Sequence, residues 1–67
     1  MARLDKNEKL LKRALPYREY GEDYDRSIDA AARDLQDAMK GGRSTGTWYD
    51  VLKMRLDRKS VEEALGR

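Results

Sequence analysis

The chain has 67 residues, 42% of them charged, and a net charge of +2. It contains neither cysteine nor histidine, which excludes a disulfide and leaves only carboxylates as metal ligands, without the spacing of a calcium-binding EF-hand loop. No apolar run is long enough to cross a membrane, and the N-terminus lacks the apolar core of a secretory signal. We therefore expect a single domain over residues 1–67 of an intracellular, cytoplasmic protein, with no metal or cofactor.

An enzyme is not expected. Histidine, the commonest general base, and cysteine, the softest nucleophile, are both absent. The serines have no neighbouring base pattern, and a domain of this size offers little room for a pocket that excludes water. No stretch matches a motif that names a family.

The first helix is predicted over residues 5–14. Asp5 is placed to accept a hydrogen bond at its N-terminus, with Glu8 three residues later, as in a capping box. Leucine and alanine form one side of this helix, and basic residues form the other. Pro16 ends it, because the residue before a proline avoids the helical conformation.

A short helical turn over residues 16–20 is predicted next, followed by a break at Gly21. Tyr17, Tyr20 and Tyr24 would share one face if the chain were helical from Pro16 onward. Two interpretations remain open for these tyrosines. They either form an aromatic contact surface or cover a small core with their hydroxyl groups in water.

The central helix, predicted over residues 23–40, is the clearest amphipathic segment. Its apolar residues recur at spacings of three and four, which places them on one side of a helix. They are Tyr24, Ile28, Ala31, Ala32, Leu35, Ala38 and Met39. Asp23 or Asp25 is expected to cap its start, and Gly41 is expected to end it in the left-handed conformation.

Residues 41–47 are rich in glycine, serine and threonine and predict a flexible connection between two roughly antiparallel helices. The third helix is expected to start at Thr47, with Asp50 at the capping-box spacing. Its apolar side is formed by Trp48, Val51, Leu52 and Leu56.

The apolar phase changes near Asp57, because Val61 and Leu65 do not continue the apolar side of the third helix. Ser60 and Glu63 have the spacing of a capping box. We therefore predict a turn at residues 57–59 and a short last helix over residues 61–65. The expected fold is all-α, a small bundle of three main helices plus a short C-terminal helix.

Charge is segregated along the chain. Residues 1–18 carry six basic and two acidic side chains, net +4, and residues 19–37 carry two basic and seven acidic, net −5. Residues 38–59 return to net +4, and residues 60–67 are net −1. The segregation either helps neighbouring helices to pack or presents one basic and one acidic face to different partners.

The favoured function is a non-catalytic protein-binding module, a small regulator, inhibitor or assembly component that docks on a larger protein, as a monomer or a homodimer. Large apolar residues are scarce, so a partner or oligomer is the remaining means of stabilisation. The expected partner-binding residues are Tyr17, Tyr20, Trp48, Tyr49 and Met54. An acidic face that imitates a row of phosphates is a narrower form of this hypothesis. Its residues are Asp25, Asp29, Asp34 and Asp37.

The alternative is a small nucleic-acid-binding protein, for DNA or RNA, that uses a basic surface from the first and third helices. Basic side chains in a row contact successive phosphates, and such contacts weaken steeply as salt rises. The residues are Arg3, Lys6, Lys9, Arg13, Arg43, Lys53, Arg58 and Lys59.

Overall fold

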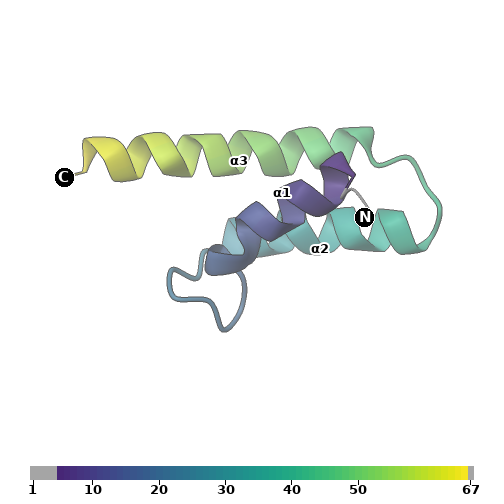
Figure 1. Cartoon of the computed structure of the whole chain (residues 1–67), viewed down its shortest axis with the longest axis horizontal. Coiled ribbons are helices and arrows are strands. Elements are labelled where there is room, and N and C mark those ends of the chain that lie inside the picture. The colour runs from purple at the N-terminus through teal and green to yellow at the C-terminus, as the bar shows by residue number, and fades with distance from the viewer. Residues whose placement is uncertain (1–4, 67) are drawn as a thin grey trace.

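The computed structural model describes residues 5–66 and is all-helical over that range (Figure 1). Its elements are α1 (Lys6–Ala14), the 3₁₀ turn η1 (Leu15–Tyr17), α2 (Arg26–Lys40) and α3 (Gly46–Leu65). α2 and α3 lie antiparallel, as predicted, and α1 packs obliquely against both (Figure 1). Within the described range, no helix combines the length and the apolar character needed to cross a lipid bilayer.

The start of α1 confirms the predicted cap. The Asp5 carboxylate accepts a hydrogen bond from the backbone N–H of Glu8 at 2.9 Å. After α1 the chain tightens into η1, with Pro16 in its first turn, where the missing proline N–H costs no helical hydrogen bond. The helical turn predicted over residues 16–20 is therefore shorter and begins one residue earlier.

The loop between η1 and α2 folds back on η1. The backbone N–H of Asp23 donates to the carbonyl oxygen of Pro16 at 2.9 Å. Gly21 lies so close to the same carbonyl that an added Cβ would stand 2.3 Å from its oxygen. Tyr20 has a φ of 73° and is 97% exposed. The three tyrosines of this region therefore do not share one helical face.

α2 starts later than predicted, with Asp25 as its cap. The Asp25 carboxylate accepts hydrogen bonds from two backbone N–H groups of the first turn. Tyr24 consequently precedes the helix and is exposed, which corrects its expected place on the apolar face. At the other end, Gly42 takes the left-handed conformation, with a φ of 67°, whereas the predicted Gly41 has a φ of −82°.

α3 begins at Gly46, one residue earlier than predicted. Thr45 occupies the capping position without a side-chain hydrogen bond to the helix, so the predicted cap at Thr47 is wrong. Thr45 instead accepts a hydrogen bond from the Asn7 side-chain amide at 3.2 Å. This contact joins the α2–α3 connection to the start of α1.

The prediction of a short fourth helix is wrong, because α3 continues unbroken for 20 residues. It runs through residues 57–59, where a turn was expected. Tertiary contacts hold this part of α3. Lys59 Nζ lies 3.2 Å from the Asp25 carboxylate. The Tyr17 hydroxyl donates to the Glu63 carboxylate at 2.9 Å. These contacts favour the continuous helix over the local capping signal.

The core lies where the three helices meet, and α2 supplies half of its buried residues. They are Leu10, Ala14, Ile28, Ala31, Ala32, Leu35, Leu52 and Leu56. The alanines have small side chains, which lets the neighbouring helices approach α2 closely. The C-terminal part of α3 extends past the ends of the other two helices (Figure 1), beyond this core.

Candidate functional site

α3 carries apolar side chains on two opposite sides. At about 100° per residue, Leu52 and Leu56 point into the core, whereas Met54, Val61 and Leu65 point the other way. The first two are buried. The other three are 53%, 56% and 81% exposed. The side of α3 that faces away from the core is therefore an uncovered apolar surface.

We call this surface the outer stripe. Its residues follow spacings of three, four, three and four, which is the heptad spacing of helices that pack along their length. They are Val51, Met54, Arg58, Val61 and Leu65. Val51 is half-buried at the edge of the core, so the stripe starts at the core. It then runs for about 21 Å along α3.

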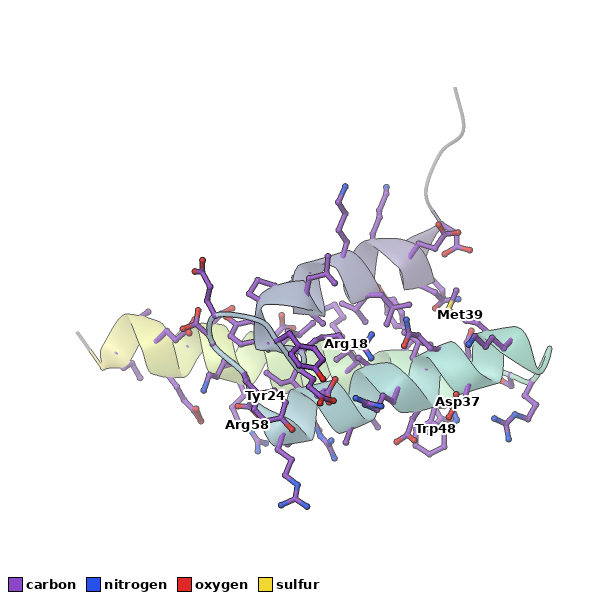
Figure 2. All side chains as sticks on the ribbon, turned by 90° about the horizontal axis from the view of Figure 1, so that it is seen from below. Arg18, Tyr24, Asp37, Met39, Trp48 and Arg58 are labelled. Atoms are coloured by element: carbon purple, nitrogen blue, oxygen red, sulfur yellow. The ribbon has the colours of Figure 1, made fainter. Side chains whose placement is uncertain are left out.

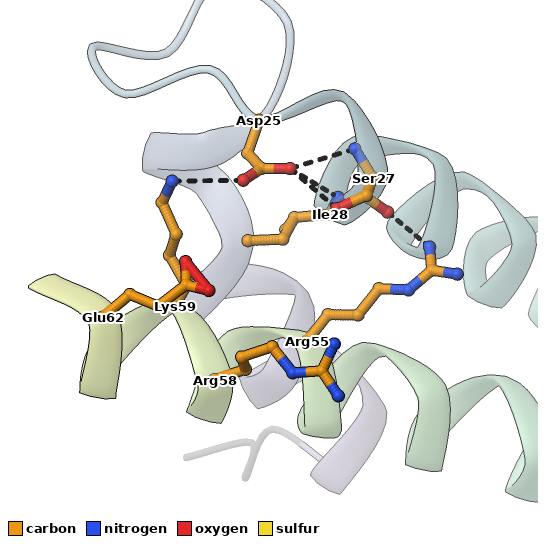
Figure 3. A pocket seen from close by; sticks show the side chains of 7 residues that line it. All are labelled: Asp25, Ser27, Ile28, Arg55, Arg58, Lys59 and Glu62. Atoms are coloured by element: carbon orange, nitrogen blue, oxygen red, sulfur yellow. Dashed lines mark hydrogen bonds and ion pairs between the residues drawn. The ribbon is translucent and has the colours of Figure 1, made fainter.

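Two charged groups, Arg58 in the outer stripe and Glu62 beside it, have no ion-pair partner inside the described chain. Among residues 5–66, no carboxylate lies within 4.0 Å of the Arg58 guanidinium, and no cation lies within that distance of the Glu62 carboxylate. Glu62 follows Arg58 by one helical turn. Their neighbour Lys59 instead pairs with Asp25 (Figure 3). An arginine and a glutamate thus remain available to a binding partner.

The groove beside Arg58 is a structural junction between α2 and α3. Arg55 donates from Nη1 to the carbonyl oxygen of Ser27 at 2.6 Å (Figure 3). A hydrogen bond from the Ser27 hydroxyl is the largest single influence on the pKa of Asp25, which is lowered, and the Lys59 ammonium contributes to the shift. The same pair raises the pKa of Lys59. These groups already form hydrogen bonds and ion pairs within the chain, so we infer that they stabilise the fold.

The five predicted partner-binding residues lie in different places. Tyr17 and Tyr49 are half-buried against the core. Tyr20 protrudes from the loop before α2, and Trp48 is 38% exposed near the start of α3. Only Met54 belongs to the outer stripe. The structure therefore does not gather these five side chains into one surface.

The predicted acidic face is not a row of free carboxylates. Asp29 is only 5% exposed and accepts hydrogen bonds from the Arg18 Nε at 3.0 Å and the Arg33 Nε at 3.1 Å. Burial acts to raise the pKa of Asp29, but the two guanidinium groups outweigh it and lower that pKa. Asp25, which caps α2, is not free either, because its carboxylate accepts backbone hydrogen bonds and pairs with Lys59. The members that remain exposed are Asp34 and Asp37.

Half of the predicted basic residues do come together, in a shallow groove between α1 and α3. They are Lys6, Lys9, Arg13 and Lys53. Leu10 and Tyr49 also line the groove, and the Lys6 Nζ lies 5.0 Å from the centre of the Tyr49 ring. Long side chains that end in nitrogen project into solvent from α1 (Figure 2). Asp57 reduces the positive charge, since it pairs with Arg13 at 2.9 Å and Lys53 at 3.0 Å.

The other predicted basic residues do not extend this groove. Arg43 lies in the α2–α3 connection. Arg58 and Lys59 line the separate groove beside Asp25. Arg3 falls outside the described residues. The seven described positions therefore do not form a single basic surface.

Val61 and Leu65 were not among the predicted surface residues, because the change of apolar phase near Asp57 placed them on a separate short helix. A signal for them exists in the sequence. The heptad spacing that starts at Val51 continues through the expected turn to Leu65 without a change of phase. One long helix with a second apolar face accounts for the change of apolar phase near Asp57 and for the heptad spacing that continues to Leu65.

No protein-family model matches the sequence, and no curated protein or solved structure is detectably similar to it.

Proposed function

We propose that the chain is a non-catalytic protein-binding module that docks through the outer stripe, as a small regulator, inhibitor or assembly component of a larger protein. The observation that carries this proposal is the heptad spacing of exposed apolar side chains on α3. A helix with such a face binds by laying it into an apolar groove or against another helix.

The energetics favour the outer stripe over the rest of the surface. Full burial of a leucine, valine or methionine side chain gains about 1.5–3 kcal/mol. Met54, Val61 and Leu65 are at least half exposed, so most of this gain is available on docking. Arg58 lies among them, and a buried cation needs an anion. The partner surface should therefore be apolar with a carboxylate opposite Arg58.

The test replaces one residue of the stripe by a charge. We expect Val61→Glu to reduce capture of the partner from a lysate of the source organism by about tenfold or more, because docking would bury a carboxylate in an apolar seam. Ala30→Glu is the matched control, since Ala30 is an exposed apolar residue on α2. Both variants should keep the circular dichroism of the parent chain.

Equal capture by the two variants would contradict docking through the outer stripe. A loss of helicity in Val61→Glu alone would also contradict it, because Val61 would then belong to the core.

A second candidate function is nucleic-acid binding in the groove between α1 and α3. The observation in its favour is the convergence of four basic side chains beside an aromatic ring. Phosphates would pair with the lysines, and the Tyr49 ring offers a stacking surface to an unpaired base. Either function, protein binding or nucleic-acid binding, would be carried out in the cytoplasm without a cofactor.

This second candidate is tested by fluorescence anisotropy with short duplex DNA and single-stranded RNA over a range of salt. Binding that weakens steeply with salt and is lost in Lys9→Glu would support it. Lys12→Glu is the control, because Lys12 is exposed on α1 and does not line the groove. Absence of binding at low salt would eliminate this function.

A further inference from the structure

The charge inside the outer stripe restricts how it can pair with a like surface. Two parallel α3 helices in register would place Arg58 opposite Arg58 of the second copy. Two guanidinium groups in an apolar seam repel each other and lack an acceptor. A parallel pair is therefore disfavoured.

Antiparallel pairing removes this conflict. When the midpoint falls between residues 59 and 60, Met54 lies opposite Leu65 of the second copy, and Arg58 lies opposite Val61 of the second copy. The arginine stem then packs on valine while its guanidinium reaches the edge of the seam. All apolar positions from Met54 to Leu65 are covered by this register.

The same register supplies the missing counter-ion. Glu62 borders the stripe one turn after Arg58, so the antiparallel helix brings Glu62 of the second copy beside Arg58. Two-fold symmetry forms this pair twice. Neither side chain has an ion-pair partner among residues 5–66. The surface is thus complementary to itself in charge as well as in apolar spacing.

The fold leaves room for a second helix here. Met54, Val61 and Leu65 face away from Leu52 and Leu56, and hence from α1 and α2, whereas Arg58 and Glu62 lie at the border of the stripe with the groove beside Asp25. The C-terminal part of α3 extends beyond both of those helices (Figure 1). A second α3 can therefore approach along residues 54–65 without meeting another element of the first copy.

We propose that the outer stripe pairs with the outer stripe of a second copy of this chain, as an antiparallel dimer joined by Arg58 and Glu62 of opposite copies. This inference rests on the proposed function, because it names the first occupant of the same surface. Three exposed apolar side chains per copy place the interface at the small end of the usual range. The dimer is consequently weak, and a larger partner displaces the second copy.

Sedimentation equilibrium from about 10 µM to about 1 mM protein tests the proposal. The average mass of the parent chain should rise toward twice that of one chain. Arg58→Glu and Glu62→Arg should each weaken association by about tenfold or more, since like charges then face each other. The double variant, Arg58→Glu with Glu62→Arg, should restore association. Met54→Glu should abolish it, because Met54 lies opposite the apolar Leu65 of the second copy, and Lys12→Glu should leave it unchanged.

A parent chain that stays monomeric over this range would overturn the dimer, and the capture experiment with Val61→Glu would still decide whether the stripe binds another protein. A dimer that ignores both single charge reversals would overturn the antiparallel register. A dimer that survives Met54→Glu would place the contact elsewhere and also overturn the proposal. Circular dichroism of each variant confirms that the fold is retained.

Discussion

α2 and α3 distribute their apolar residues in different ways. Those of α2 lie on one side, and from Ile28 to Ala38 the core-facing ones are almost completely buried. Those of α3 lie on two sides, of which only the side with Leu52 and Leu56 is buried in the chain. Each apolar face of a helix calls for a surface that covers it, and the second face of α3 has none within the described chain. α2 serves the core alone, whereas α3 serves the core and carries the face that we propose for docking.

The largest expected effect separates the two kinds of apolar residue. Leu35→Ala should lower the free energy of unfolding by about 2–5 kcal/mol, because it leaves a cavity in the core. Leu65→Ala should change it by less than about 0.5 kcal/mol, since Leu65 is exposed in the monomer. Urea denaturation followed by circular dichroism, at a concentration where the chain is monomeric, measures both. Similar losses would mean that both faces of α3 are part of the core.

The continuity of α3 is tested by Val61→Pro. In a continuous helix this proline removes the hydrogen bond to the carbonyl four residues earlier and clashes with it, at a cost of about 3 kcal/mol. If Val61 instead opened a separate helix, proline would be tolerated at its first position. Thermal denaturation of Val61→Pro against Val61→Ala distinguishes these cases. Equal melting temperatures would contradict the continuous helix.

The buried carboxylate of α2 should control stability in acid. The pKa of Asp29 is lowered, so its stabilisation is complete above the pKa of an unfolded aspartate, about 3.9, and is lost as the pH falls below that value. Asp29→Asn should lower the free energy of unfolding at neutral pH by about 1–3 kcal/mol.

Melting temperatures between neutral pH and strong acid measure this dependence. The decline of stability in acid should be shallower in Asp29→Asn than in the parent chain. The same decline in both would show that other carboxylates, such as Asp25 or Asp57, account for all of it.

A smaller loss of stability is expected on the inner side of the C-terminal part of α3. Tyr17→Phe removes the hydrogen bond to the Glu63 carboxylate, which should lower the free energy of unfolding by about 0.5–1.5 kcal/mol. Glu63→Gln, which keeps an acceptor for the Tyr17 hydroxyl, is the conservative comparison. A stability of Tyr17→Phe equal to that of the parent chain would mean that this contact does not hold α3.

The features that could be predicted from the sequence are those set by residues close to one another along the chain. Asp5 and Glu8 are three residues apart, and their cap forms as expected. The apolar side of α2 also follows from local spacing. The elements that were missed depend on distant contacts. The Tyr17–Glu63 hydrogen bond joins residues 46 positions apart and helps to keep α3 continuous despite the capping signal at Ser60.

Burial of the candidate site residues was missed for the same reason. Asp29 is exposed on an isolated α2, and it becomes buried because Arg18, from the preceding loop, lies over it. The outer stripe is the converse case. Val61 and Leu65 are apolar but stay exposed, because no other segment of the described chain reaches that side of α3. Neither outcome follows from the pattern of a single helix.

The most direct test of this account is the ¹³Cα chemical shift of each residue of α3 in solution. The outer stripe exists only if Asp57, Arg58 and Lys59 are helical. We expect helical shifts at every position from Thr47 to Glu63, without a dip at these three residues. Non-helical shifts at Asp57–Lys59 would restore the turn, direct Val61 and Leu65 toward the core, and contradict the docking surface.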